Sequence, residues 1–558
     1  MELIAKTLAV AFDEAVAKYS NKVFLHFPDE EETYDWNEVN CRVTELAKGF
    51  IAAGVCHGDR VALMMPNGSQ WAFTQIALLK VGAISVLINS NYKTLELSQL
   101  LKDSDAKMLI VPDKTKHMDY AEMAYTLFPS LSVSTMGELD DARYPHLRSV
   151  VCMSEDEYSG MLSKASLIAM GRTVTDSALA EATARVQPHD GSVMMYTSGT
   201  TGFSKGVCMT HFSVLNVTRS TADIMHIHDD DILFAPLPLF HIFGYVALCM
   251  TFVIGDSLVL AQSFQPVQAL ECIEKYRATA LFAVPTIYVA LTAHPDLSNY
   301  DCSSLKKGVA AGALCPKAVM EASHKLLGME YLHQAYGLTE VTGPVTMTRR
   351  EDQSPWKYES VGRPMHQMEL KIMDINSDEE LPRGKEGRIF IKGYGVMDGY
   401  YSKPEETAEV FYQDGWFDSG DLGTMDENGF IYFSGRTKEL IVRGGENIYP
   451  KEIESFLVSF PDITDAQAVG IPSLLYGEEI LVSVIPAQGA MLTEEDVIER
   501  IREALAFFKV PRFVEFTESF PLTGSGKVAK YRLKDDAVRQ LREQGIEVPL
   551  RRQKVKQV

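Results

Sequence analysis

Residues 196–207 read YTSGTTGFSKGV and follow an apolar strand-like run at residues 192–195. Glycines and hydroxyl side chains in such a loop expose N–H and O–H donors that can wrap the oxygens of a polyphosphate, and Lys205 adds a positive charge. The stretch is not a Walker A loop, because Ser204 stands where G-x-x-x-x-G-K-S/T requires its second glycine. The alternative is a surface linker of small polar residues. We interpret residues 196–207 as a phosphate-binding loop that follows a strand of an α/β sheet.

Short apolar runs bounded by turn residues recur on both sides of this loop, with helical stretches between them. Such alternation is typical of α/β units that build a parallel sheet. The expected strands are residues 60–65, 84–88, 108–111, 258–261 and 281–284.

Two changes of texture divide the rest of the chain. From Gly362 the sequence predicts a small β-rich subdomain of about 362–437, with short strands at residues 369–373, 387–392 and 430–434. After residue 438 a compact α+β pattern follows, and about 120 residues are enough for an independent domain. We therefore predict a large domain at residues 1–437 and a smaller one at 438–558. In the smaller domain we expect strands at residues 439–442, 466–469 and 480–485 and helices at 450–460 and 494–507.

Composition excludes several classes of protein. The chain has 558 residues, of which 46% are hydrophobic and 23% charged, which excludes disorder, collagen and coiled coil as whole-chain descriptions. The formal net charge of −22 argues against nucleic acid or an anionic membrane surface as a partner. An anionic substrate would need a local cluster of cations and N–H groups.

The eight cysteines show no C-x-x-C pair and no metal-ligand spacing, so we expect reduced thiols, most of them buried. Residues 1–12 lack a basic region and a cleavage site of small residues, and Asp13 and Glu14 end the apolar stretch. The strongest apolar run, residues 244–260, is interrupted by Asp256 and is too short to cross a bilayer. We expect a cytoplasmic protein without a transmembrane segment.

The loop at residues 196–207 closely resembles the phosphate-binding signature of the adenylate-forming superfamily, which includes acyl-CoA synthetases, luciferases and peptide-synthetase adenylation domains. Further segments resemble other motifs of that family in the family's order and cover nearly the whole chain. They are LPLFH at 237–241, AYGLTE at 335–340, DGWFDSGD at 414–421, GRTK at 435–438, RGGENIYP at 443–450 and PLTGSGK at 521–527. The resemblance implies two α/β subdomains and a small β-barrel in the large domain, and a mobile α+β C-terminal domain.

The resemblance also assigns residues to ATP and to Mg²⁺. Tyr336 offers a flat face for adenine, and the Gln334 amide beside it suits the exocyclic amine. Glu340 suits Mg²⁺, which prefers carboxylate and phosphate oxygens. Without the family match, Tyr336 would be read as a core residue and Asp421 as a turn former. The nucleotide and CoA residues implied are Thr197, Ser198, Gly199, Thr200, Thr201, Gly202, Lys205, Gly312, Gln334, Tyr336, Gly337, Thr339, Asp421, Arg436, Gly444, Gly445 and Glu446.

The residues implied to be catalytic are Lys527, His241, Thr339 and Lys438. A fixed ammonium at Lys527 would neutralise the charge that builds as a carboxylate attacks the α-phosphorus. Lys438 is the implied hinge, about which the small domain would rotate after adenylation to bring residues 444–446 toward the pantetheine thiol.

The acid site implied by the resemblance lacks the aspartate that amino-acid-activating domains use for the substrate ammonium, because His241 follows Phe240. An uncharged acyl group is therefore favoured. The implied pocket walls are Phe240, Phe243, Gly244, Val284, Thr286, Ile287, Ala311 and Gly312, although a plain hydrophobic core would have the same composition. Segments 311–316, 476–479 and 508–512 resemble the medium-chain fatty acyl-CoA synthetase branch.

Two positions depart from the family pattern. Ser204 replaces the usual proline and releases a fixed φ, and Lys530 occupies a place often held by arginine, which puts a bidentate phosphate contact in doubt.

The resemblance implies an ATP-dependent acid–thiol ligase with small-molecule partners: a carboxylic acid, ATP and CoA, with Mg²⁺. The alternatives are an aryl-CoA ligase of benzoate or coumarate type, a luciferase-type monooxygenase, and a non-catalytic nucleotide sensor. A sensor is disfavoured because Lys527 and Glu340 are both present. Acyl chain length, pathway and oligomeric state stay open, and a homodimer is compatible with the sequence.

Overall fold

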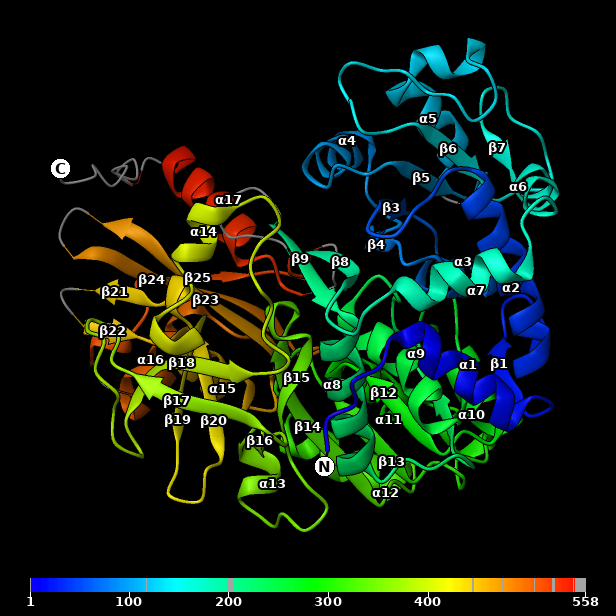
Figure 1. The fold of residues 1–558 in the computed structure, drawn as a ribbon. Helices are drawn as coiled ribbons and strands as arrows, with labels where there is room; N and C mark the ends of the chain where they lie inside the picture. The colour runs from blue at the N-terminus through cyan, green and yellow to red at the C-terminus, as the bar shows by residue number, and fades with distance from the viewer. Residues whose placement is uncertain are drawn as a thin grey trace. The chain divides into compact units, whose positions relative to one another are not determined.

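The structure is a computed structural model and describes residues 2–116, 118–197, 205–443, 446–473, 476–505, 507–523, 527–544 and 546, without the side chains of residues 438, 442, 446, 447 and 477. Figure 1 shows the course of the chain through helices and strands. Contacts divide it into two compact units. The larger holds residues 1–370, 390–419 and 427–431, and the smaller holds residues 371–389, 420–426 and 432–558.

A nine-stranded sheet in the larger unit has the order β16-β15-β14-β13-β12-β10-β11-β1-β2. The strands from β14 to β1 in this order pair in parallel, and the strands at both edges pair antiparallel. The bounds are β1 (Val23–Phe27), β2 (Glu32–Asp35), β10 (Ile232–Phe234), β11 (Ser257–Val259), β12 (Ala280–Ala283), β13 (Lys307–Ala310), β14 (Tyr331–Leu338), β15 (Gly343–Met347) and β16 (Arg363–Pro364).

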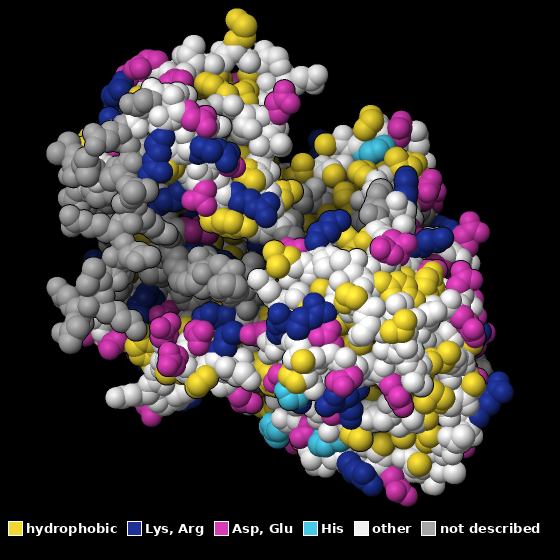
Figure 2. Space-filling view, turned by 90° about the horizontal axis from the view of Figure 1, so that it is seen from above, with side chains coloured by type: hydrophobic (Ala, Val, Ile, Leu, Met, Phe, Trp, Pro, Cys, Tyr) yellow, Lys and Arg dark blue, Asp and Glu magenta, His cyan; other side chains and the backbone are white. Residues whose placement is uncertain are grey.

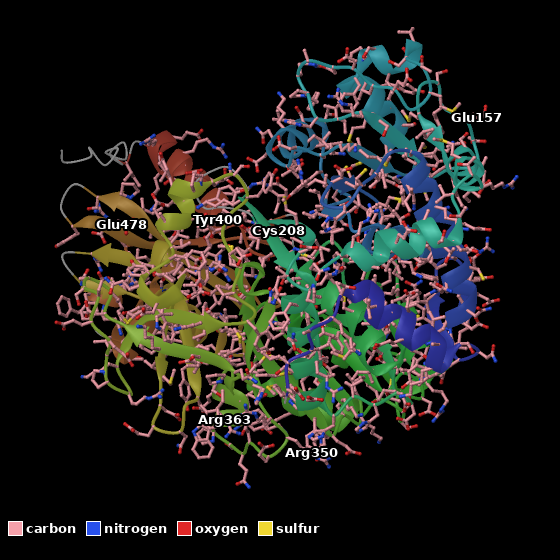
Figure 3. All side chains as sticks on the ribbon, in the orientation of Figure 1. Glu157, Cys208, Arg350, Arg363, Tyr400 and Glu478 are labelled. Carbon is pink, nitrogen blue, oxygen red and sulfur yellow. The ribbon has the colours of Figure 1, made fainter. Side chains whose placement is uncertain are left out.

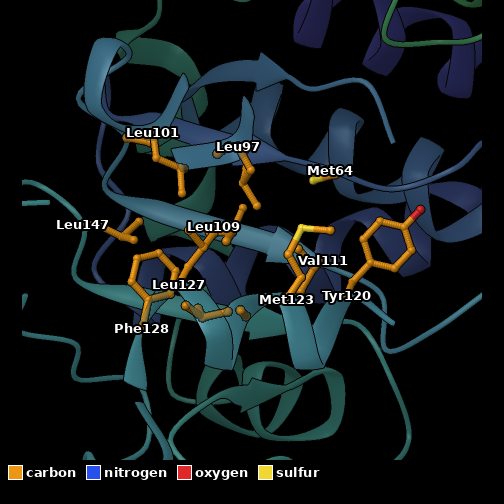
Figure 4. Packing of buried hydrophobic residues seen from close by; sticks show 14 of the residues in the cluster. Met64, Leu97, Leu101, Leu109, Val111, Tyr120, Met123, Leu127, Phe128 and Leu147 are labelled. Carbon is orange, nitrogen blue, oxygen red and sulfur yellow. The ribbon is translucent and has the colours of Figure 1, made fainter. Parts of the chain in front are cut away.

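A seven-stranded sheet in the same unit has the order β7-β6-β5-β3-β4-β8-β9 and is parallel except for the β8–β9 pair. Leu109 and Val111 of β5 belong to a buried apolar cluster on this sheet. Leu127 and Phe128, at the end of helix α5, belong to the same cluster (Figure 4). The bounds are β3 (Arg60–Leu63), β4 (Ile84–Leu87), β5 (Met108–Val111), β6 (Ser149–Cys152), β7 (Leu162–Ser163), β8 (Gly191–Thr197) and β9 (Lys205–Thr210).

Helices of the larger unit cover both faces of the nine-stranded sheet. α9 connects β10 to β11 in one direction and α10 connects β11 back to β12, so right-handed crossovers place these two helices on opposite faces. Most residues of the strongest apolar run lie in α9, which Gly255 caps at its C-terminus. Gly255 has a φ of +83° and lies close to the Tyr19 ring, and both features exclude a larger residue. Asp35 and Glu38 form a capping box that starts α2.

The helices of the larger unit have the following bounds: α1 (Leu8–Tyr19), α2 (Trp36–Ala52), α3 (Ser69–Val81), α4 (Thr94–Asp103), α5 (Tyr120–Leu127), α6 (Lys164–Gly171), α7 (Asp176–Arg185), α8 (His211–Met225), α9 (Ile242–Ile254), α10 (Pro266–Tyr276), α11 (Pro285–Thr292), α12 (Lys317–Leu326), α13 (Trp356–Glu359) and α14 (Pro404–Ala408). The 3₁₀ turns are η1 (Pro129–Val133), η2 (Leu297–Asn299), η3 (Thr339–Val341) and η4 (Gln413–Gly415).

The β-rich segment forms a four-stranded sheet in the order β17-β18-β19-β20, with bounds β17 (Met368–Met373), β18 (Glu386–Gly393), β19 (Phe417–Met425) and β20 (Ile431–Arg436). The expected small barrel is therefore corrected to a four-stranded sheet, since small closed barrels need about five to eight strands. The division into two units runs through these strands, whereas the sequence placed it at Lys438. The boundary at residue 438 stays a prediction.

The C-terminal part is a sheet with helices on both faces. β21 (Ile441–Arg443), β22 (Glu446–Ile448), β23 (Ile463–Ser473), β24 (Gly477–Pro486) and β25 (Phe513–Phe516) form the order β22-β21-β24-β23, with β25 beside β24. Ala466 and Ala468 of β23 join one core and Val469 and Ile471 join another, so both faces of the sheet are buried. The remaining elements are α15 (Pro450–Val458), α16 (Glu494–Ala504), α17 (Lys530–Glu543), η5 (Thr437–Glu439) and η6 (Phe507–Lys509).

These elements confirm the predicted mixed α/β class with a smaller α+β unit. Cys41 and Cys56 are exposed, Cys208 is half-buried and the other five cysteines are buried, all as free thiols. Across the described ranges, no helix has the length and apolar character to traverse a bilayer. On the face seen in Figure 2, acidic and basic side chains are interspersed.

Candidate active site at the carboxyl edge of the nine-stranded sheet

The strand order of the nine-stranded sheet reverses at β10. The chain goes from β10 to β11 on one side and then returns to β12, β13 and β14 on the other. Parallel pairing of Phe234 with Leu281, and of Ala310 with Gln334, brings the carboxyl ends of these strands to one edge. Ligands of open α/β sheets bind at such a reversal, outside the carboxyl ends of the strands.

The loops at this edge carry most of the predicted acid-site residues. Phe240 and His241 follow β10, and their half-buried rings lie 5.7 Å apart. Val284 follows β12 as the N-cap of α11, and half-buried Ala311 follows β13. The fold therefore gathers four residues from three loops, and their role in holding an acid stays a prediction.

Three other predicted wall residues, Phe243, Gly244 and Ile287, pack against neighbouring parts of the protein. Thr286 is exposed. The Phe243 ring lies 5.9 Å from that of Phe282 on β12, and Ile287 is 5% exposed. A Cβ on Gly244 would lie 2.4 Å from the carbonyl oxygen of Pro238, so glycine allows the first turn of α9 to approach that backbone. These contacts explain the residue types without a substrate.

Gly312 has a φ of +85°, in the left-handed region. Any side chain at this position strains the backbone. A change in acyl-chain preference in Gly312→Leu would therefore combine backbone strain with the loss of space for the acyl chain.

The β8–β9 hairpin carries the predicted phosphate-binding loop, with Thr197 paired to Lys205. The predicted strand at residues 192–195 lies in β8, whereas residues 196–197 and 205–207 of the predicted loop also belong to strands β8 and β9. Ser198, Gly199, Thr200, Thr201 and Gly202 lie outside the described residues. The Lys205 ammonium lies 4.5 Å from the centre of the Tyr400 ring.

Glu340 lies in η3, directly after β14, and is half-buried. Its Oε1 accepts a hydrogen bond of 3.2 Å from the Tyr400 hydroxyl, and its backbone oxygen accepts one of 2.9 Å from the Met397 N–H. Burial raises the pKa of Tyr400, and the Glu340 charge raises it further. The phenol is thus a hydrogen-bond donor to the carboxylate.

The donor set at Glu340 fits Mg²⁺. Glu340 Oε2 has no hydrogen-bond partner among the described residues. Those residues also contain no group of three or more Asp, Glu, His or Cys side chains that could hold a metal ion by themselves. Mg²⁺ is commonly held by one or two carboxylates together with substrate phosphates. A Mg²⁺ held by Glu340 would supply positive charge to phosphate oxygens, and phosphate contact at Thr339 stays a prediction.

Gln334 and Tyr336 lie on β14 and are 1% and 8% exposed. The Gln334 amide oxygen accepts from the Cys315 N–H at 2.9 Å, and its amide nitrogen donates to the Tyr358 carbonyl at 3.1 Å. These bonds hold the loop after β13 against β14. Contact between the Gln334 amide and adenine stays a prediction.

Gly337 follows on the same strand. A Cβ there would lie 1.8 Å from the Gly343 carbonyl oxygen, so glycine permits the tight β14–β15 turn.

Two predicted ribose residues meet in the smaller unit. The Asp421 carboxylate, on β19, lies 3.2 Å from the Arg436 Nε at the end of β20, and the two side chains are 2% and 41% exposed. The pair explains why a buried carboxylate is tolerated there. Contact with a ribose stays a prediction.

Lys527 is exposed at one end of a short hairpin that an antiparallel bridge between Leu522 and Val528 closes. The Thr523 side chain accepts from the Lys527 N–H at 3.2 Å. Gly444 and Gly445 lie outside the described residues, as do the side chains of Glu446 and Lys438. The predicted roles of these four residues stay predictions.

Lys530 illustrates a departure from the family pattern. Its ammonium donates to the carboxylate of Glu454, which is 3% exposed, and lies 3.6 Å from Glu439. Within this unit the lysine serves an internal ion pair.

Tyr400 is the residue at this site that the sequence did not single out. The available signal was Gly399-Tyr400-Tyr401, an aromatic pair after a glycine in a loop. Nothing in its spacing connects it to Glu340.

Comparison with known proteins decides the family. The family model described as AMP-binding enzyme matches residues 12–401, and the one described as AMP-binding enzyme C-terminal domain matches residues 452–527. The chain belongs to the AMP-binding enzyme family. This confirms the predicted family.

Relatives in this family agree along nearly the whole chain. YngI of Bacillus subtilis (strain 168), provisionally named an acyl-CoA synthetase, is 36% identical over 96% of this chain and 98% of that protein. The mitochondrial medium-chain acyl-CoA ligase ACSF2 of Homo sapiens is 32% identical over 97% of this chain and 89% of that protein. The structure of ATP-bound MatB from Rhodopseudomonas palustris matches with a TM-score of 0.80 and 26% identity over 95% of this chain and 99% of that one.

These matches confirm the predicted enzyme class, an acyl-CoA synthetase, and at family level the use of ATP, Mg²⁺ and CoA.

Proposed function

We propose that this enzyme activates a medium-chain fatty acid as acyl-AMP, with release of pyrophosphate, and then transfers the acyl group to CoA, with release of AMP. The observation that carries this proposal is the carboxyl edge of the nine-stranded sheet. There the apolar side chains of Phe240, Val284 and Ala311 occupy the same set of loops as Glu340. Apolar side chains and a carboxylate at one edge of the sheet support an acid that has a hydrocarbon tail and a reacting carboxylate.

The substrate we propose carries no ammonium group. The resemblance implies that Phe240 and His241 occupy the position where amino-acid-activating domains carry an aspartate. An ammonium buried without a counter-ion is strongly disfavoured. The medium-chain relative supports the same class of acid.

For the sites we propose that Lys205, Glu340 and Thr339 contact the phosphates and Mg²⁺, Tyr336 and Asp421 the nucleoside, and residues 444–446 the CoA thiol. Lys527 would neutralise charge between the acyl oxygen and the leaving pyrophosphate.

We propose Lys438 as the pivot between a domain of residues 1–437 and one of residues 438–558. Lys438→Pro fixes φ at this position and should slow thioester formation while sparing acyl-AMP formation. Separate assays of the two half-reactions test this. Normal overall turnover would exclude Lys438 as the pivot.

A panel of acids tests the substrate. Straight-chain acids from two to sixteen carbons, benzoate and a cinnamate are each supplied with ATP, Mg²⁺ and CoA, and AMP release is measured. We expect a medium-length optimum. Activity with amino acids, or none with any acid, would refute the proposal.

An aryl-CoA ligase is the second candidate, and one observation favours it. The Phe240 and His241 rings, 5.7 Å apart, offer aromatic faces to a flat acid. Benzoate or cinnamate above every aliphatic acid in the panel would establish this reading.

We further propose a cytoplasmic location, which the free cysteines support, and a homodimer, the commonest closed assembly. Cell fractionation and light scattering at several protein concentrations test the two statements.

A further inference from the structure

The loop between β18 and α14, residues 394–403, joins two parts of the candidate active site. Toward β9, the Tyr401 N–H donates to the Gly206 carbonyl at 2.8 Å, and Tyr400 forms an antiparallel bridge with Val207. Figure 3 labels Tyr400 near Cys208, which follows Val207 on β9. One side of this loop is therefore part of the hairpin that carries the phosphate-binding segment.

The same loop also holds the turn that carries Glu340. The Met397 N–H donates to the Glu340 carbonyl at 2.9 Å, and the Thr342 hydroxyl donates to the Gly395 carbonyl at 2.6 Å. Residues 394–403 thus bond to both β9 and the turn of Glu340, and all of these segments belong to the larger unit.

Tyr400 is the side chain that contacts both parts. Its hydroxyl donates to Glu340 Oε1 at 3.2 Å, and the Lys205 ammonium lies 4.5 Å from the centre of its ring. Its N–H donates to the Thr407 hydroxyl at 3.0 Å, which fixes its backbone. A hydrogen bond to a carboxylate and a cation on an aromatic face are both favourable, and together they define one orientation of the ring.

The position of the ring has an electrostatic consequence. Lys205 and Glu340 carry opposite charges and reach the same side chain, yet in the described part of the chain they form no ion pair with each other. A direct pair would neutralise both charges, and a polyphosphate with its cation would have to break it. With the ring between them, the ammonium stays available to phosphate oxygens and the carboxylate to a divalent cation.

We propose that Tyr400 is a positioning residue of the nucleotide site: its hydroxyl orients the Glu340 carboxylate toward Mg²⁺, and its ring keeps Lys205 from pairing with that carboxylate. This inference rests on the proposed function in so far as the bound ligand is ATP with Mg²⁺.

Binding of ATP to the full-length protein, measured by isothermal titration calorimetry with and without Mg²⁺, is the primary test. Tyr400→Phe keeps the ring and removes the hydroxyl, so it should weaken Mg²⁺-ATP binding about threefold to tenfold and leave binding of metal-free ATP nearly unchanged. Tyr400→Leu also removes the ring, so Lys205 should pair with Glu340 and both forms of ATP should bind about tenfold more weakly.

Tyr401→Phe is the matched control. It makes the same change at the next residue, where the hydroxyl donates to Asp105 Oδ2 at 3.0 Å and not to Glu340. The control should bind both forms of ATP as the parent does. Acyl-AMP formation should need a higher Mg²⁺ concentration in Tyr400→Phe, with an unchanged KM for the acid.

A double variant tests the hydrogen bond from the carboxylate side. In a Glu340→Gln background, Tyr400→Phe should add little further loss of Mg²⁺-ATP affinity, because the two changes remove one shared interaction. Additive losses would overturn the proposal. Thermal unfolding without nucleotide verifies that each variant folds.

The outcomes separate the two proposals. If the parent does not bind Mg²⁺-ATP, the proposed function fails, and the inference with it. If the parent binds Mg²⁺-ATP and Tyr400→Phe binds it equally well, the positioning role is wrong and the proposed function stands. The same conclusion follows if Tyr400→Phe and Tyr401→Phe weaken the binding of both forms of ATP to the same extent.

Discussion

The carboxyl edge of the larger unit and the Lys527 hairpin of the smaller unit hold their reactive groups in contrasting ways. At the edge, Glu340 is half-buried and both its carboxylate and its backbone are bound by one loop. Lys527 is exposed on a short hairpin, where its backbone N–H donates to the Thr523 hydroxyl at 3.2 Å. From this difference we predict that Glu340 belongs to a rigid site for phosphate and metal, whereas exposed Lys527 serves one step of the reaction.

Removing the exposed lysine should give the largest effect. Lys527→Ala should reduce acyl-AMP formation about a hundredfold or more, because one ammonium would neutralise the developing charge, and should spare thioester formation from supplied acyl-AMP. Arg532→Ala, an exposed cation of α17, is the control. Equal loss in both half-reactions would contradict the contrast between the two regions.

Changing the rigid site should give a smaller effect that is specific to the metal. Glu340→Gln should raise the Mg²⁺ concentration for half-maximal adenylation about tenfold, since an amide oxygen lacks the charge that a hard cation prefers. Glu359→Gln, at an exposed position in α13, should leave the Mg²⁺ titration unchanged. An unshifted titration in Glu340→Gln would exclude it as a metal ligand.

We predict that the apolar residues Phe240, Val284 and Ala311 line the acyl site and set the preferred chain length. Each methylene that they bury contributes about 0.8 kcal/mol, or about fourfold in kcat/KM, until the space is filled. Val284→Phe should therefore move the optimum to shorter acids. Val289→Phe, 46% exposed on the same helix, should not. Equal loss with all acids in Val284→Phe would show that this residue does not line the acyl site.

A buried acid away from both regions provides the smallest effect. Burial raises the pKa of Asp256, whose two carboxylate oxygens have no hydrogen-bond partner among the described residues. The folded state therefore binds the proton more tightly than the unfolded state, and the free energy of unfolding decreases as pH rises above about 4.

Asp256→Asn removes this titration and should raise the free energy of unfolding at pH 7 by about 1 kcal/mol. Denaturant unfolding of both proteins at pH 4 and pH 7 measures it. A parent that is more stable at pH 7 relative to Asp256→Asn than at pH 4 would reverse the sign of this prediction.

Short-range features of the fold and site were readable from the sequence. The strand at residues 108–111 and the helix that begins at residue 450 depend on apolar periodicity and proline placement, which neighbouring residues encode. Glycines and hydroxyl residues next to apolar runs indicated the segments of Lys205, Glu340 and Lys527, although Lys205 begins β9 and Glu340 lies in η3. For the same reason, the motifs by themselves indicate the family.

The tertiary structure alone decided how these loops are held. Tyr400 reaches Glu340 across 60 residues of chain, and Lys530 pairs with Glu454 across 76. The four-stranded sheet and the amide bonds of Gln334 likewise depend on segments that meet only when the chain is packed. Local preferences set which residues form a strand or a turn, but partners distant in sequence are selected by packing of the whole unit, which no single stretch of sequence encodes.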